Sequence, residues 1–208
     1  LIIIDAGTGI IGLGQKLLAR SFNGSNGSSL EPLVMTLLIG HTHHDHTQGF
    51  PFFVPAYQGT STIHIFGPRT LSEDLEEALA RSMVPPAFPI ELNDLYSRLV
   101  IRNIDESEIL LYTRHSKVPS VRNIYQEAIA LEPETVKVSL FKSFAHPKGG
   151  TLIYRIEAGG KSMVYASDTE GYLGGDSRLT AFARDTDLLI HDAQYTHEEY
   201  LALPVPKQ

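Results

Sequence analysis

The sequence contains no cysteine. Disulfide bonds and thiolate metal sites are therefore excluded, and any metal ion must be held by histidine and carboxylate side chains. The absence of cysteine does not by itself identify a cellular compartment. It does make the histidines and acidic residues the groups to examine for metal binding.

Long hydrophobic runs are also missing. No apolar stretch approaches the ~18 residues that a membrane-spanning helix needs. The opening segment LIIID (1–5) is too short for a signal peptide and has the wrong flanking residues. We therefore expect a cytoplasmic protein that makes no membrane contact.

Basic residues are fewer than acidic ones. The chain has 17 Lys and Arg against 24 Asp and Glu, which gives a formal net charge of −7. An acidic chain is a poor general binder of nucleic acids, although a local basic patch remains compatible with this total. Between 98 and 148 the two signs are nearly balanced, and no long basic arm rich in glycine and proline is present.

The length and composition fit one globular domain. The 208 residues are 42% hydrophobic and 20% charged, which is enough apolar material for a sizeable core. No internal repeat or linker divides the chain, so we expect a single domain over 1–208. Because the sequence opens inside a strand-like run and ends in LALPVPKQ, we interpret it as an internal segment with residues missing from one or both ends.

Apolar runs bounded by turn residues predict an alternation of strands and helices. The predicted helices cover 10–20, 71–83 and 179–184, and 21–32 is a polar loop. A Gly159-Gly160 turn joins two strands in a hairpin. We predict irregular strands and loops for 84–135, which is rich in proline and forms a possible insertion at the rim of a site. The predicted strands cover 1–4, 33–39, 62–66, 136–144, 151–157, 162–166 and 188–190.

The segment GTGIIG (7–12) matches the G-x-G-x-x-G pattern of dinucleotide-binding turns. The acidic residue expected about twenty positions later would be Glu31, which lies beside Pro32 in a polar loop and not at a strand end. We therefore favour a second interpretation, in which Gly7 and Gly9 permit a tight turn from strand to helix.

The segment HTHHDH (41–46) is much more specific. Side chains two positions apart in an extended segment point the same way, so His41 and His43 can hold one metal ion. Asp45 and His46 follow where the chain turns and can serve a second ion. His44 occupies a position between ligands, and we expect it to lie at the rim.

Further candidate ligands follow later strands. His146 comes after the strand predicted at 136–144, Asp168 after 162–166, and His191 after 188–190. A lone histidine at a strand end is more often structural. Three His or Asp residues at successive strand ends, in a chain that also contains HTHHDH, favour metal binding. A two-metal site is possible because a carboxylate such as Asp168 can offer one oxygen to each ion.

Together these segments resemble the metallo-β-lactamase fold superfamily. HTHHDH matches its H-x-H-x-D-H motif, and LIIIDAGTGI resembles its strand ending in D-x-G. The segments AHPKGGTLIYRIEAGGKSMVYASDTE and DLLIHDAQYT resemble its phosphodiesterase branch, which includes transfer-RNA 3′-processing endonucleases and cyclic-nucleotide phosphodiesterases. The resemblance implies an α/β protein, an αββα four-layer sandwich of two mixed β-sheets flanked by helices.

The resemblance also implies a ligand set for two divalent metal ions, with zinc favoured and manganese or iron as alternatives. His41, His43 and His146 would hold the first ion, Asp45 and His46 the second, and Asp168 would bridge both. The family's seventh ligand, a histidine, has no good match here. His197 is a poor candidate, so we expect that ligand beyond Gln208.

The implied function is a metal-dependent hydrolase that uses a dinuclear site to activate water for phosphodiester cleavage. Asp45 would orient the water, and His191 or Asp192 would support protonation of the leaving oxygen. The charge balance led us to favour a small cyclic phosphodiester or cyclic nucleotide over RNA. A transfer-RNA 3′-processing endonuclease, a lactone or carboxyl-ester hydrolase and a non-catalytic metal-binding domain stay open. A homodimer is implied by the resemblance alone.

Overall fold

The computed structural model describes residues 1–24, 32–70, 72–126, 131–132, 134–146, 149–170 and 175–202. Most of the polar loop predicted over 21–32 lies outside these ranges, as does Leu71 at the start of a predicted helix. The expectation of a seventh ligand beyond Gln208 concerns no described residue and stays a prediction.

The amino-terminal half forms a four-stranded sheet, called sheet A. Its order is β1-β2-β3-β4, and every pair is parallel. Parallel neighbours need a crossover between them, which explains why helical segments separate these strands. The strands are β1 (Ile2–Ile4), β2 (Leu33–Leu38), β3 (Ser61–Gly67) and β4 (Arg98–Asn103). The helices are α1 (Gly9–Gly24), α2 (His44–Thr47), α3 (Leu75–Arg81) and the short 3-10 helices η1 (Phe50–Phe52), η2 (Val54–Tyr57) and η3 (Leu92–Asp94).

The carboxyl-terminal half forms a six-stranded sheet, called sheet B. Its order is β10-β9-β8-β7-β5-β6, with β10 parallel to β9 and the other pairs antiparallel. The strands are β5 (Glu108–Tyr112), β6 (Ser120–Asn123), β7 (Val136–Ser143), β8 (Thr151–Ala158), β9 (Lys161–Ala166) and β10 (Leu188–His191). Helix α4 (Ser177–Phe182) precedes β10, and α5 (His197–Leu201) follows it.

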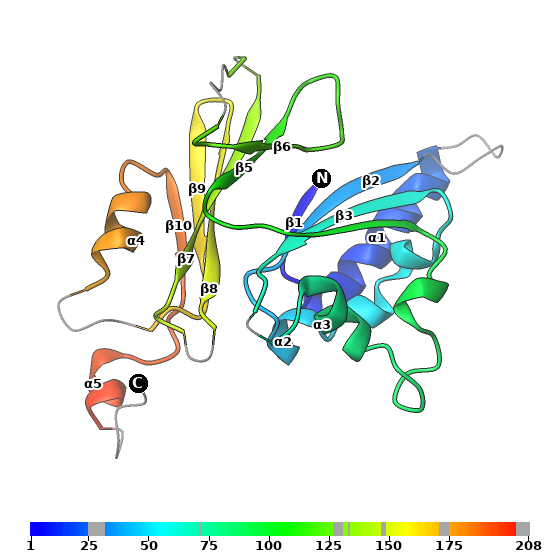
Figure 1. Cartoon of the computed structure of the whole chain (residues 1–208), viewed down its shortest axis with the longest axis horizontal. Helices are drawn as coiled ribbons and strands as arrows, with labels where there is room; N and C mark the ends of the chain where they lie inside the picture. Colours follow the sequence, from blue (N-terminus) through cyan, green and yellow to red (C-terminus); the bar gives the residue numbers. More distant parts are fainter. Residues whose placement is uncertain are drawn as a thin grey trace.

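Three apolar clusters account for the layers seen in Figure 1. Side chains that alternate along β2 divide between two of them: Leu37 packs toward the α1 side, whereas Leu38 packs between the sheets. The third cluster joins sheet B to α4 through Phe141 and Leu179. The order is therefore α1 and α3, sheet A, sheet B and α4, which confirms the predicted four-layer α/β fold.

Most predicted elements are present with small shifts in their ends. The helix predicted over 71–83 begins at Leu75, because the Asp74 side chain accepts from the Glu77 backbone N–H and the Glu77 carboxylate accepts from the Asp74 backbone N–H. Gly159 and Gly160 form the predicted hairpin turn with positive φ at both positions.

Two features of the fold differ from the sequence analysis. Sheet A is parallel throughout its described strands, where we expected a mixed sheet. The range 84–135, predicted as irregular strands and loops and a possible insertion, contributes β4 to sheet A and β5 and β6 to sheet B. Strands β4 and β6 are mostly half-buried and lack long apolar runs, whereas β5 is a short run whose central residues are buried.

Three tyrosines of sheet B donate their hydroxyls across to the sheet A side. Tyr112 donates to Thr36 Oγ1 at 2.8 Å, Tyr154 to the Ile39 carbonyl at 2.8 Å and Tyr165 to Asp5 Oδ2 at 3.2 Å. The second and third of these bonds lie where β2 and β1 end. The two sheets are therefore held together at the edge that carries the histidine-rich segment.

The described helices were also compared with the requirements of a membrane span. None of them is both long and apolar enough to cross a bilayer.

Candidate metal centre

The candidate ligands meet at one edge of the two sheets. In sheet A, His41 follows β2, and α2 then carries Asp45 and His46. In sheet B, His146 follows β7 and Asp168 follows β9. Strands β7 and β9 are each antiparallel to β8, so they end at the same edge. The topology therefore brings together residues that lie more than 100 positions apart in sequence.

The first group consists of three imidazoles, those of His41, His43 and His146. A nitrogen of each lies within 4.8 Å of a nitrogen of the other two. His146 Nε2 is 3.1 Å from His43 Nδ1, and the His41 ring centroid is 4.6 and 4.3 Å from those of His43 and His146. This group contains no carboxylate.

The second group combines His41 with His46 and Asp168, again with ligand atoms within 4.8 Å of one another. His46 Nε2 is 2.9 Å from Asp168 Oδ2 and 3.5 Å from Asp45 Oδ2. Asp168 has a positive φ of 52°, an uncommon conformation for a residue other than glycine. The Asp45 side chain is 69% exposed, so this carboxylate faces solvent at the mouth of the site.

His41 is the residue common to both groups, and its environment suits a cation. The residue is 4% exposed, and neither ring nitrogen has a hydrogen-bond partner among the residues that the structure describes. A buried polar atom without a partner is costly in a folded protein. Burial, followed by the nearby His46, His146 and His43, lowers the pKa of His41 to about 3, so the ring stays neutral and keeps a lone pair for a metal ion.

Asp5 is a contributor that the sequence analysis missed. Its Oδ2 lies 2.9 Å from His46 Nδ1, and its Oδ1 accepts from the Gly40 backbone N–H at 2.8 Å. Because Asp5 holds one ring nitrogen of His46, the other nitrogen is presented to the cluster, an arrangement common around metal-binding histidines. The signal was available, since Asp5 follows a strand just as the other candidates do.

The charges around His46 differ from those around His41. Burial lowers the pKa of His46, but its hydrogen bond to Asp5 and the charges of Asp5, Asp168 and Asp45 together outweigh this effect and raise it above the usual value. His146 shows the opposite balance: burial and His43 lower its pKa more than Asp168 and Glu170 raise it. The group around His46 therefore has carboxylates beside it, whereas the group that contains His43 and His146 consists of imidazoles.

Gly7 and Gly49 lie in close contact where the β1 turn packs against the loop that bears Asp45 and His46. A Cβ added to Gly7 would lie 2.5 Å from the Asp45 carbonyl oxygen, and one added to Gly49 would overlap the Gly7 carbonyl. By contrast, nothing lies within 4 Å of a Cβ added to Gly9 or Gly12. These contacts agree with a tight turn beside the site, the interpretation that we favoured over a dinucleotide-binding turn.

The family model described as "Beta-lactamase superfamily domain" matches residues 1–204. The chain belongs to this superfamily. The predicted metallo-β-lactamase fold and its class, metal-dependent hydrolases, are thereby confirmed. Divalent metal binding is general in this fold, and both ligand groups described above are compatible with it.

Two relatives and one solved structure illustrate the superfamily membership. The chain is 24% identical to a ribonuclease Z of Pyrococcus horikoshii over 96% of its own length and 67% of the relative's. It is 22% identical to ribonuclease Z of Bacillus subtilis, covering 78% of this chain and 59% of that one. The crystal structure of human tRNase Z, short form, matches with a TM-score of 0.54 at 17% identity over 97% of this chain and 70% of that chain, which supports the fold. Several relatives thus extend well beyond the matched region.

These relatives overturn one prediction. We expected a small phosphodiester partner in preference to RNA, but the relatives of this superfamily member are ribonucleases. The expectation came from counting charges along the sequence. Such counts do not show where charges lie on the surface, and RNA binding depends on the local field and not on the total.

Asp45, predicted as a ligand of the second ion, lies beside His46 but belongs to neither group. His191 and Asp192 also lie outside both groups. His191 Nδ1 donates to the Asp192 carbonyl at 2.6 Å, and its Nε2 is 3.1 Å from Thr169 Oγ1. His191 thus contacts Thr169, the residue that follows Asp168. His44 is exposed at the start of α2 and belongs to neither group.

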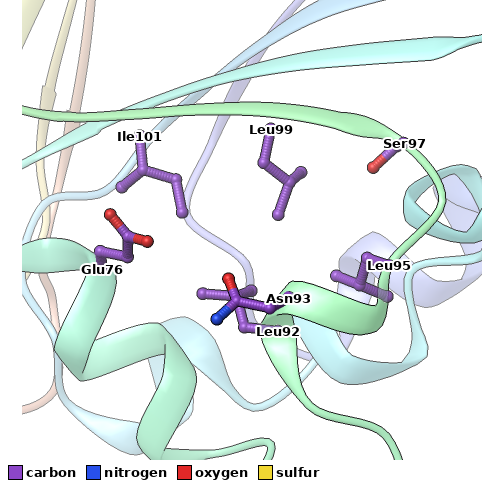
Figure 2. A pocket seen from close by; sticks show the side chains of 7 residues that line it. All are labelled: Glu76, Leu92, Asn93, Leu95, Ser97, Leu99 and Ile101. Atoms are coloured by element: carbon purple, nitrogen blue, oxygen red, sulfur yellow. The ribbon is translucent and has the colours of Figure 1, made fainter.

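A separate cavity lies on the α3 side of sheet A. Its volume is about 220 Å³, and Figure 2 shows its lining residues, which come from α3, from β4 and from η3 and the segment between η3 and β4. Glu76 is the one acidic residue in this lining, which contains no histidine. The cavity therefore lacks the donor set of a metal centre. It is lined by Glu76, Leu92, Asn93, Leu95, Ser97, Leu99 and Ile101.

Proposed function

We propose that this chain is a metal-dependent ribonuclease that cleaves a phosphodiester bond in transfer-RNA precursors at the 3′ side. The superfamily membership, the ribonuclease Z relatives and the tRNase Z neighbour support this proposal over the cyclic-nucleotide reaction. The chain spans about three fifths to two thirds of the length of these relatives, so the activity of the whole enzyme is part of the proposal.

The observation that carries the proposal is the buried His41 ring, with two unpartnered nitrogens at the junction of two ligand groups. His41, His43 and His146 would hold one cation, and His46, Asp45 and Asp168 the other. When bound, two divalent cations supply Lewis-acid chemistry: they make a water molecule more acidic and stabilise charge on the phosphoryl group. Zinc suits the imidazole-rich donor set, and manganese or iron suit it as alternatives.

The chain's own residues supply the orientation. Asp45 is exposed beside His46, so its carboxylate can accept a hydrogen bond from a water molecule and aim it at phosphorus. Asp5 fixes the His46 ring, which in turn contacts Asp168. The leaving oxygen needs a proton, and His191 and Asp192 are the groups that we propose to support that transfer beside the Asp168–Thr169 turn.

A direct test uses the chain with Zn²⁺ or Mn²⁺ and a transfer-RNA precursor that carries a 3′ trailer. We expect release of the trailer, followed on a denaturing gel, together with slower hydrolysis of bis-p-nitrophenyl phosphate. His43→Ala removes one ligand of the first group and should lower both rates by at least about 100-fold, since losing even an outer partner of a metal ligand costs 10–100-fold.

Mature transfer RNA, which has no trailer, is the matched substrate control. If the metal-loaded chain hydrolyses the small diester but leaves every RNA intact, the ribonuclease proposal fails while the hydrolase class stands. If His43→Ala keeps full activity, the assignment of the first ligand group is wrong.

A further inference from the structure

Tyr165 links sheet B to the carboxylate that orients His46. Its hydroxyl donates to Asp5 Oδ2 at 3.2 Å, and the same oxygen lies 2.9 Å from His46 Nδ1. The other oxygen of Asp5 accepts from the Gly40 backbone N–H. These three donors come from β9, from α2 and from the turn after β2. Together they fix both the position and the plane of the Asp5 carboxylate.

The same strand, β9, leads directly to Asp168. Asp168 Oδ2 lies 2.9 Å from His46 Nε2, so the His46 ring is contacted on one nitrogen by Asp168 and on the other by Asp5. Tyr165 links the two carboxylates, because it hydrogen-bonds to Asp5 from β9, the strand that leads to Asp168. The His46 side chain is 12% exposed and that of Asp5 is 9% exposed, so solvent competes weakly for these bonds.

We propose that Tyr165 is a positioning residue for the metal position formed by His46 and Asp168, and that its hydroxyl raises the affinity of that position selectively. The inference rests on the ligand set of the proposed function. Within the described residues, His43 and His146 make no hydrogen bond to Asp5 or to Tyr165. The position formed by these two histidines with His41 should therefore be indifferent to the Tyr165 hydroxyl.

The expected loss of metal affinity in Tyr165→Phe follows from the number of contacts between Tyr165 and the metal ligands. Removing a residue that holds a metal ligand in place typically weakens metal binding by about 10–100-fold. Tyr165 acts on His46 through Asp5, one contact further out, so we expect about 10-fold, the lower end of that range.

Tyr112 provides a matched control. Its hydroxyl also crosses between the sheets, donating to Thr36 Oγ1 at 2.8 Å. Thr36 lies within β2, five residues before His41, which places this bond on the order of 16 Å from the ligands at about 3.3 Å per residue. Tyr165→Phe and Tyr112→Phe therefore delete the same atom, a hydroxyl that donates across the two sheets, but Tyr112 donates to a hydroxyl far from the ligands and Tyr165 to the Asp5 carboxylate.

The experiment is a Co²⁺ titration of the metal-free chain and both variants, followed by the visible absorption of bound cobalt. This readout does not depend on RNA cleavage. We expect the unaltered chain to bind two equivalents. Tyr165→Phe should bind the first with unchanged affinity and the second about 10-fold more weakly, with altered absorption bands for the second. Tyr112→Phe should titrate like the unaltered chain.

The inference is overturned if both variants titrate alike, or if Tyr165→Phe weakens the first equivalent as much as the second. Loss of the fold in Tyr165→Phe but not in Tyr112→Phe would also overturn it, because the hydroxyl would then serve the fold and not the metal position. A single equivalent bound by the unaltered chain would contradict the ligand set of the proposed function itself. If the unaltered chain binds two equivalents of Co²⁺ but does not cleave RNA, only the proposed ribonuclease reaction is contradicted.

Discussion

Two buried histidines, His41 and His64, are alike in burial and differ in their neighbours. They are 4% and 7% exposed, and burial is the largest cause of the lowered pKa of each. In the described part of the chain, both have ring nitrogens without a hydrogen-bond partner: two in His41 and Nε2 in His64. Around His41 lie three imidazoles, with the carboxylate of Asp168 also in reach. His64 lies in the middle of β3, paired with Thr36 and Val100, and its charged neighbour is Arg98.

The difference shows what makes a candidate metal centre. An unpartnered buried nitrogen is compatible with a ligand site, but it also occurs in the middle of a sheet. What distinguishes His41 is the convergence of other neutral or anionic donors on the same space. A nearby guanidinium, as at His64, instead repels a cation. The two residues can therefore be compared experimentally with the same substitution at each.

The largest expected effect is that of His41→Ala. Since His41 belongs to both ligand groups, we expect its loss to weaken Zn²⁺ binding and RNA cleavage by more than about 100-fold. His64→Ala should leave both within about twofold, because His64 is no part of either group. Metal content by mass spectrometry and cleavage rates measure the contrast, with circular dichroism as the check on folding. Two bound equivalents in His41→Ala would remove the distinction between the two histidines.

The second prediction concerns how the unfolding free energy depends on pH through His64. Burial and Arg98 lower the pKa of His64 below 6.5, so the unfolded chain takes up this proton before the folded chain does as pH falls. The stability that depends on neutral His64 is complete above about pH 6.5 and is lost progressively below it. We expect His64→Gln to flatten the fall in unfolding free energy between pH 7 and 5, measured by urea denaturation of the metal-free chain.

The exposed His115 is the control for that measurement. His115→Gln makes the same substitution at an exposed position, and its slope is the reference for that of His64→Gln. Since His41 also has a lowered pKa, the metal-free chain keeps part of its slope in every variant, and the quantity to compare is the difference between variants. Equal slopes for His64→Gln and the unaltered chain would place the pH sensitivity elsewhere.

The smallest expected effect is that of His44→Ala. His44 lies between two candidate ligands in sequence, yet it is exposed and belongs to neither group. We expect RNA cleavage and Zn²⁺ binding to change by less than about twofold, in line with surface substitutions away from special features. A loss comparable to that of His43→Ala would show that the local density of histidine, and not the geometry of particular rings, supports metal binding.

The strands that could be predicted from sequence were those with a strong apolar pattern. Leu33–Leu38 is an almost continuous apolar run, whereas Val136–Ser143 alternates apolar residues with Lys and Ser, and both were predicted to within a residue. Strands β4 and β6 carry a mixture of charged and apolar residues, so only their pairing partners make them strands. The parallel order of sheet A likewise follows from packing that no local pattern contains.

The candidate site was predictable in its residues but not in its supports. HTHHDH, His146 and Asp168 gave strong local signals, and the fold brings these segments together. Asp5 and Tyr165 did not, because their contacts with His46 and with each other span 41 and 160 positions. The choice of a small substrate failed for a related reason: charges counted along the chain carry no information about the surface that they form.

The contact between Gly7 and Gly49 has a consequence for how substitutions would be interpreted. Neither residue has a side chain, yet any side chain at either position would push apart the β1 turn and the loop that bears Asp45 and His46. In a saturation mutagenesis screen scored by activity alone, both positions would be as intolerant as the metal ligands. A comparison of activity with protein abundance would show whether a substitution at these glycines acts by displacing the loop and not by removing a reacting group.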